Sequence, residues 1–192
     1  MTDTSPLGTR GRSALRLLGS ALVEDAGVLR TRVFVGLANL LPDLDVFSLF
    51  ARPVLLRLAG ARVGFPSRIR PPLFVHSASG VEIGRWAFIN QGCRIEGRKT
   101  VRIGESALIG PFCLFENVNH RPEGPEGLPI TVGRGAWIGA GCILLPGAVV
   151  GDGATVGAGS VVRGEVPAGE TWAGVPARPL RRGPDSGGGA ER

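Results

Sequence analysis

The chain has 2 histidines, His76 and His120, and 3 cysteines, so few side chains could serve as a base, a nucleophile or a metal ligand. An imidazole with an unperturbed pKa near 6.5 can remove a proton from a hydroxyl at neutral pH, which typically contributes ~10²- to 10⁴-fold to the rate. His120 stands in the polar stretch Asn119-His120-Arg121-Pro122. A single histidine in such a loop can equally be a solvated surface residue.

The cysteines follow a packing pattern. Cys93, Cys113 and Cys142 each lie four residues after an aliphatic residue, at the small position where Ala or Ser stands in other repeats. They lack the paired spacing of zinc ligands, and an odd number of cysteines suits a reducing compartment. We therefore expect packing roles for the thiols, no bound metal, and a cytoplasmic protein.

A six-residue repeat in the sequence positions these histidines and cysteines. Aliphatic residues recur every six positions at Val132, Ile138, Leu144, Val150, Val156 and Val162. Four positions after each of the first five stands a small residue: Ala136, Cys142, Ala148, Ala154 and Ser160. A period of six does not fit a helix, and each hexad is too short for a hairpin. The pattern predicts a solenoid of short parallel strands joined by tight corners, with the aliphatic side chains pointing into a shared core.

Upstream, residues 63–120 show the same six-residue repeat in groups of three hexads. We predict a mainly β fold of about five triangular coils, at residues 63–80, 83–100, 103–120, 132–149 and 150–167. The breaks in the period all follow a third hexad, and the longest is the insertion from Arg121 to Thr131. The insertions are therefore expected to leave from one corner of the triangle.

The ends of the chain differ from the repeats. Residues 1–60 are interpreted as an N-terminal helical cap or extension, with short amphipathic helices at Ala14–Val23 and Val28–Leu40 that break near residues 25–27 and at Pro42. A further helix at Pro53–Ala59 would cap the solenoid. Residues 61–182 form the predicted β-helix and its C-terminal extension, and the polar tail 183–192 is expected to be disordered.

The N-terminal region contains apolar runs that could contact a membrane. Its longest uncharged apolar run, residues 33–42, is too short to cross a bilayer, so we expect no transmembrane segment. The amphipathic segment is expected to pack against the coils or a neighbouring subunit, with attachment to a membrane surface as the alternative.

Three stretches resemble a known family. They are Ala87-Phe88-Ile89-Asn90-Gln91-Gly92-Cys93, Ala136-Trp137-Ile138-Gly139-Ala140 followed by Leu145-Pro146-Gly147, and Val156-Gly157-Ala158-Gly159-Ser160 followed by Ala173-Gly174-Val175-Pro176-Ala177-Arg178. Over residues 52–182 the chain resembles the hexapeptide-repeat acyltransferases, in particular their maltose and galactoside O-acetyltransferase-like branch. The resemblance implies a left-handed parallel β-helix and a homotrimer with active sites between subunits.

The resemblance also implies a CoA-dependent O-acetyltransferase. The acetyl group would move from acetyl-CoA directly to a hydroxyl of a sugar, a glycan precursor or a related small molecule, with no covalent enzyme intermediate. His120 matches the family's general base, and the backbone N–H of Ala140 matches the donor to the oxyanion. Asn90 matches an acceptor-binding asparagine, although its place in the hexad also suits a turn. His76 matches an acceptor contact, or it merely occupies a corner.

Several residues match the family's coenzyme A contacts: Trp137, Ala140, Ala158, Arg163, Gly164, Arg178 and Arg181. Arginine suits phosphate because its planar fork makes two hydrogen bonds at once. For Trp137 a subunit contact is the alternative, and for the arginines a solvated basic terminus. No metal is implied, because a γ-class carbonic anhydrase of this fold needs three zinc histidines per site.

Charge and composition narrow the partners. The formal net charge is +6, with the basic residues spread along the chain, which argues against a nucleic-acid arm. It is compatible with a polyanion such as coenzyme A, and it can equally reflect genome composition. Two other functions stay open: acetylation of an antibiotic or other natural product by the same machinery, and a catalytically silent trimeric scaffold.

Overall fold

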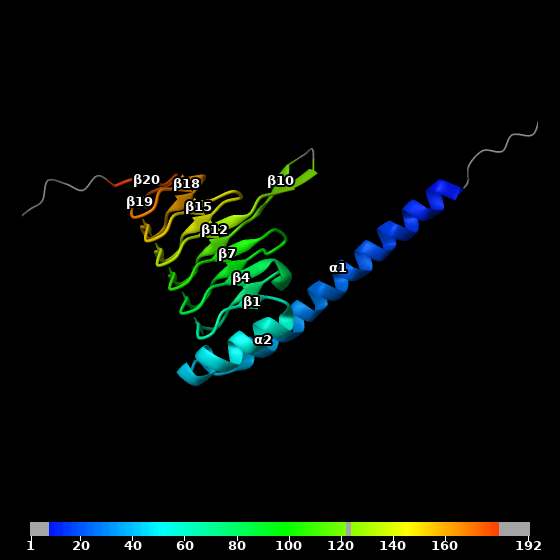
Figure 1. The fold of residues 1–192 in the computed structure, drawn as a ribbon, viewed down its shortest axis with the longest axis horizontal. Coiled ribbons are helices and arrows are strands. Elements are labelled where there is room, and N and C mark those ends of the chain that lie inside the picture. The colour runs from blue at the N-terminus through cyan, green and yellow to red at the C-terminus, as the bar shows by residue number, and fades with distance from the viewer. Residues whose placement is uncertain (1–7, 122–123, 181–192) are drawn as a thin grey trace, which may run out of the picture.

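The computed structural model describes residues 8–121 and 124–180. The chain forms a parallel β-solenoid of about five turns, with two helices at its N-terminal end (Figure 1). The sequence-based prediction of a mainly β fold with preceding helices is confirmed. The aliphatic residues of the hexads point inward and are buried, which explains why each coil keeps them.

Three parallel sheets form the sides of the solenoid, and each coil contributes one strand to each of them. The first sheet consists of β1 (Arg62–Val63), β4 (Val81–Ile83), β7 (Val101–Ile103), β12 (Ile130–Val132), β15 (Val149–Val150) and β18 (Glu165–Val166). The second consists of β2 (Arg68–Ile69), β5 (Phe88–Ile89), β8 (Leu108–Ile109), β13 (Trp137–Ile138), β16 (Thr155–Val156), β19 (Thr171–Ala173) and the antiparallel β20 (Arg178–Pro179). The third consists of β3 (Phe74–Val75), β6 (Arg94–Ile95), β9 (Leu114–Phe115), β14 (Ile143–Leu144) and β17 (Val161–Val162).

The insertions leave from the corner between the third and first sheets, as predicted. The 3₁₀ turn η2 (Ala78–Gly80) occupies this corner in the first coil. In the third coil the same corner sends out a hairpin of β10 (Val118–Arg121) and β11 (Gly124–Gly127), which we call the arm. The arm projects away from the stacked coils (Figure 1).

The prediction of two short helices before residue 42 was wrong. Residues Gly8–Leu40 form one continuous helix, α1, which passes through the expected break. Gly27 costs only about 1 kcal/mol relative to alanine within a helix, and no proline occurs between residues 8 and 41. The Thr31 hydroxyl also donates to the Gly27 carbonyl at 2.9 Å, inside the helix.

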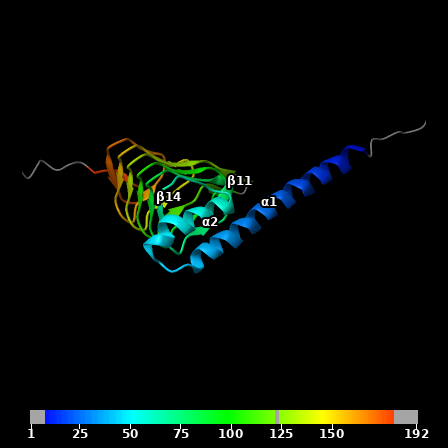
Figure 2. The ribbon, with the colours of Figure 1, turned by 60° about the horizontal axis from the view of Figure 1, so that its bottom comes forward.

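The far half of α1 extends beyond the solenoid (Figures 1 and 2). Its other half packs on the first coils through the buried Thr31, Val35 and Ala38. The opposite face exposes an apolar stripe at Leu22, Leu29, Val33, Leu37 and Leu40. Within residues 8–121 and 124–180, no helix combines the length and the apolar character needed to cross a bilayer.

A π-helical turn, η1 (Phe47–Ala51), leads into α2 (Arg52–Ala59), which lies under the first coil. Leu56 and Ala59 of α2 are buried with the core. The helix ends at Gly60, whose φ of 113° is the left-handed conformation that favours glycine. Thus α2 closes one end of the hydrophobic core, as the helix predicted at Pro53–Ala59 was expected to do. The tail predicted to be disordered, residues 183–192, lies outside the described residues.

Candidate functional site

The predicted site residues fall on two corners of the solenoid. We call the corner between the second and third sheets the 2–3 corner, and that between the third and first sheets the 3–1 corner. Asn90 directly follows β5 and lies at the 2–3 corner. Ala140 and Ala158 occupy the same corner in the fourth and fifth coils, and both are exposed. Together they form one column.

The other column runs along the 3–1 corner. His76 follows β3 there and is partly buried, and its Nε2 lies 3.3 Å from a guanidinium nitrogen of Arg98. The backbone of His120 lies in β10 of the arm, paired with Pro125 of β11. Arg163 and Gly164 occupy the same corner of the fifth coil and are exposed.

Two further residues lie near the upper coils. Trp137 points outward from β13 in the second sheet, and 56% of its surface is exposed. In the register of that sheet it stands beside Leu108, which is also exposed. Arg178 lies in β20, at the edge of the second sheet, and its side chain donates to the carbonyl of Ala177. Arg181 lies outside the described residues.

The two columns are far apart within one chain. Asn90 and Glu96 mark the two ends of one side of the second coil, six residues or roughly 20 Å apart at most. The arm carries His120 still further outward (Figure 1). A base must come within about 3 Å of the proton that it removes. Within one protomer, a strand of the third sheet therefore separates the corner with Asn90 from the corner that leads to His120.

At the 2–3 corner, glycines of the later coils lie directly against backbone nitrogens of the next coil. A Cβ on Gly110 would lie 2.6 Å from the Ala140 nitrogen, and one on Gly139 would lie 2.5 Å from the Ala158 nitrogen. The coils stack so closely that these positions exclude side chains. The same stacking occurs at the corner between the first and second sheets, where Gly64 and Gly133 have similar contacts. Close stacking of the coils therefore explains these glycines without any role in binding.

The first two coils have no glycine at this position of the 2–3 corner. Arg70 and Asn90 stand where Gly110, Gly139 and Gly157 stand in the later coils. Arg70 is adjacent to Asn90 because β2 and β5 pair with Ile69 opposite Ile89. Sequence analysis missed Arg70, which reads as one more surface arginine. The signal that could have found it was its position in the repeat, one coil before Asn90.

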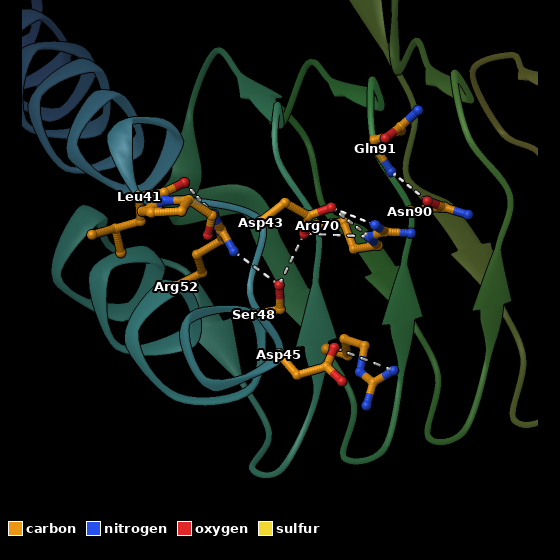
Figure 3. A network of polar contacts seen from close by, with 10 residues as sticks. Leu41, Asp43, Asp45, Ser48, Arg52, Arg70, Asn90 and Gln91 are labelled. Carbon is orange, nitrogen blue, oxygen red and sulfur yellow. Dashed lines mark hydrogen bonds and ion pairs between the residues drawn. The ribbon is translucent and has the colours of Figure 1, made fainter.

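Arg70 is held by Asp43, from the segment between α1 and α2 (Figure 3). The Arg70 Nε donates to Asp43 Oδ2 at 3.0 Å, and Nη2 donates to the same oxygen. The hydrogen bond from Arg70 holds the pKa of Asp43 below its usual value, and the same bond raises the pKa of Arg70. Both groups are therefore charged at neutral pH.

A buried arginine anchors this segment. Arg52 is 1% exposed and donates to the carbonyls of Ala38 (3.1 Å) and Pro42 (2.8 Å) and to the Ser48 hydroxyl (2.8 Å). Ser48 in turn lies 3.4 Å from Asp43 Oδ1. Since Arg52 binds the carbonyls at the end of α1, it fixes the loop that carries Asp43 (Figure 3).

The cysteines form a ladder inside the core rather than a reactive site. Cys93, Cys113 and Cys142 are at most 1% exposed, and their thiols donate to the carbonyls of Gly110, Gly139 and Gly157. The hydrogen bond with Cys113 and burial raise the pKa of Cys142. Among the described residues, no group of three His, Cys, Asp or Glu side chains gathers to hold a metal ion.

Comparisons with known proteins identify the family of this chain. Residues 129–164 match the family described as bacterial transferase hexapeptide (six repeats). Nodulation protein L of Rhizobium leguminosarum bv. viciae is 44% identical over 65% of this chain and 69% of its own length. Galactoside O-acetyltransferase of Escherichia coli K12 is 34% identical over 68% of each chain.

A solved structure extends the match. A hexapeptide-repeat acetyltransferase of Vibrio cholerae, complexed with acetyl coenzyme A, superposes with a TM-score of 0.75 at 26% identity, over 82% of this chain and 87% of that one. The chain belongs to the hexapeptide-repeat acetyltransferases. The predicted family and enzyme class are thereby confirmed.

Proposed function

We propose that this protein transfers the acetyl group of acetyl-CoA to a hydroxyl of a carbohydrate or a carbohydrate-containing small molecule. The family gives the enzyme class, and the galactoside O-acetyltransferase supports the acceptor class. The Vibrio acetyltransferase supports acetyl-CoA as the donor. One structural observation carries the proposal. The residues that match the family's site lie in two columns, one along the 2–3 corner and one along the 3–1 corner.

The division implies that the active site forms between protomers. The 3–1 corner of one chain would bring His120 and His76 to the 2–3 corner of the next, which carries Asn90 and Ala140. A cyclic arrangement repeats this contact around a ring, and we propose a homotrimer. The outward-facing Trp137 and Leu108 would lie along the same contact, where aromatic and aliphatic side chains favour burial.

The reaction proceeds by direct transfer. His120 takes the proton of the acceptor hydroxyl, and the oxygen attacks the thioester carbonyl of acetyl-CoA. The new carbon–oxygen bond gives a tetrahedral oxyanion, to which the backbone N–H of Ala140 donates. The carbon–sulfur bond then breaks, and the imidazolium returns its proton to the CoA thiolate. No covalent enzyme intermediate forms.

The remaining residues bind the two substrates. Asn90 and His76 would contact the acceptor. Trp137 would lie beside the pantetheine arm, and Ala158 would donate its backbone N–H to it. The guanidinium groups of Arg163, Arg178 and Arg181 would bind the CoA phosphates. Gly164, next to Arg163, would lie at the same contact. Three free cysteines fit a reducing compartment, and we place the reaction in the cytoplasm.

A calorimetric titration with acetyl-CoA tests the donor site without knowledge of the acceptor. We expect saturable micromolar binding that Arg178→Ala weakens by about tenfold, since one charge-assisted hydrogen bond to phosphate is lost. Arg134→Ala is the matched control, because Arg134 is an exposed arginine paired with Asp152 at the corner between the first and second sheets. A folded oligomer that binds no acetyl-CoA would instead support a catalytically silent scaffold.

A further inference from the structure

At the 2–3 corner, the first two coils carry a pair of polar side chains of which only one belongs to the predicted site. Arg70 and Asn90 occupy positions at which the later coils have only glycine. Asn90 matches an acceptor-binding residue by resemblance, whereas neither Arg70 nor Asp43 has been assigned a role. The adjacency of the three residues in space suggests that they act together (Figure 3).

The hydrogen bonds leave donors free on both residues. Arg70 uses Nε and Nη2 for Asp43, and among the described residues its Nη1 has no hydrogen-bond partner. The Asn90 Oδ1 accepts the backbone N–H of Gln91 at 2.9 Å, and its Nδ2 has no partner within the same described part of the chain. The Arg70 and Asp43 side chains keep 41% and 32% of their surface exposed, so a ligand can reach them.

The anchoring network fixes the position of the carboxylate. Asp43 is held by Arg70 and contacts Ser48, and Ser48 accepts a hydrogen bond from the buried Arg52. Holding these groups in place before a ligand arrives lowers the entropy lost on binding. An ordinary surface ion pair, such as Arg134 with Asp152, has no comparable buried support in the structure.

These groups match adjacent hydroxyls. A sugar hydroxyl both donates and accepts, so one hydroxyl can donate to the Asp43 carboxylate and accept from Arg70 Nη1. The neighbouring hydroxyl can accept from Asn90 Nδ2. The opposite charges of Asp43 and Arg70 cancel, which favours an uncharged polyol over an anionic one.

We propose that Asp43 and Arg70 form, with Asn90, an acceptor subsite that binds two adjacent hydroxyls of an uncharged carbohydrate. The subsite rests on the proposed acetyltransferase function and adds a specificity determinant to it. Asp43 and Arg70 bind the acceptor away from the reacting hydroxyl. They should therefore govern acceptor affinity and selectivity more than the rate of acetyl transfer.

Steady-state kinetics with methyl galactoside, methyl glucoside and their monodeoxy analogues test the subsite. Asp43→Asn removes the carboxylate charge, and Arg70→Lys removes the planar fork. We expect the acceptor KM to rise about tenfold or more in each variant, as for one lost charge-assisted hydrogen bond. The kcat should stay within about threefold and the KM for acetyl-CoA should not change, because neither residue contacts the reacting atoms. Asp152→Asn, at the exposed pair with Arg134, is the matched control and should behave like wild type.

The deoxy analogues distinguish direct contact with the sugar from a structural role of Asp43. A structural role would leave the ratio of the KM values for the deoxy analogue and the parent sugar unchanged. In wild type, one deoxy position should raise KM about tenfold, whereas Asp43→Asn should no longer distinguish that analogue from the parent sugar. Unchanged acceptor KM in both variants of an active enzyme would overturn the subsite and leave the proposed function standing. Preference for galacturonate over methyl galactoside would overturn its neutral character. A wild-type enzyme that binds acetyl-CoA but acetylates no sugar would overturn both.

Discussion

Mixing two inactive variants tests whether the active site is shared between protomers. We expect His120→Ala to lose ~10²- to 10⁴-fold in rate, as for removal of a general base, and Asn90→Ala to lose acceptor binding. Each variant still has the intact column that the other lacks. In the structure, a strand of the third sheet separates the two corners, so the proposed site takes His120 from one chain and Asn90 from another.

The magnitude follows from that geometry. In a ring assembled at random from equal amounts of both variants, about half of the chains offer an intact His120 and about half an intact Asn90. About a quarter of all interfaces then combine both intact halves. We therefore expect the co-expressed mixture to recover about a quarter of the wild-type activity, measured as CoA release with methyl galactoside.

A second mixture is the control for this assay. His120→Ala combined with His76→Ala alters two residues of the same 3–1 corner. In this mixture an intact interface requires one chain that keeps both His76 and His120, and every chain lacks one of the two. This pair should therefore give no recovery. Absence of recovery in the first mixture, from variants shown to co-assemble, would refute the shared site.

Three further predictions concern stability and the thiols. Arg52→Ala should lower the free energy of unfolding by about 3–5 kcal/mol and Tm by roughly 6–20 °C, because buried carbonyls lose their donor; a calorimetric shift no larger than that of the exposed Arg62→Ala would contradict this. The hydrogen bond from Arg102 lowers the pKa of Glu82, so this carboxylate stabilises the fold above about pH 4.5 and ceases to do so as pH falls through its folded pKa. Urea unfolding of Glu82→Gln should accordingly show a shallower loss of stability on acidification, and a slope equal to that of wild type would count against the ion pair. The three buried cysteines should resist a thiol reagent in the native protein and react after unfolding, whereas rapid native labelling would show that the coils open.

The solenoid was predictable because its inward positions carry one repeated requirement. Each hexad must bury an aliphatic side chain and fit a small residue beside the bend, and residues such as Ile138 and Cys142 are 0% exposed for that reason. The single corner for the insertions followed from the same register. The course of α1 did not follow, because Asp25 and Gly27 look like a local stop signal while the packing of the helix on the coils is a tertiary effect.

The acceptor side of the site was only partly visible in the sequence. Asn90 was found through a family motif, but Asp43 lies in a segment without repeats, and its contact with Arg70 joins residues 27 positions apart. Arg70 differs from other surface arginines only by standing where later coils have glycine. That exception has meaning once the stacking distances at Gly110 and Gly139 are known.

The measurement that tests the central claim most directly is product analysis by mass spectrometry after incubation of the protein with acetyl-CoA and methyl galactoside. The account predicts a sugar carrying one acetyl ester and free CoA in equal amounts with the wild-type protein. With His120→Ala it predicts a ~10²- to 10⁴-fold lower yield. An unmodified sugar with wild-type protein that binds acetyl-CoA, or an equal yield from His120→Ala, would contradict it.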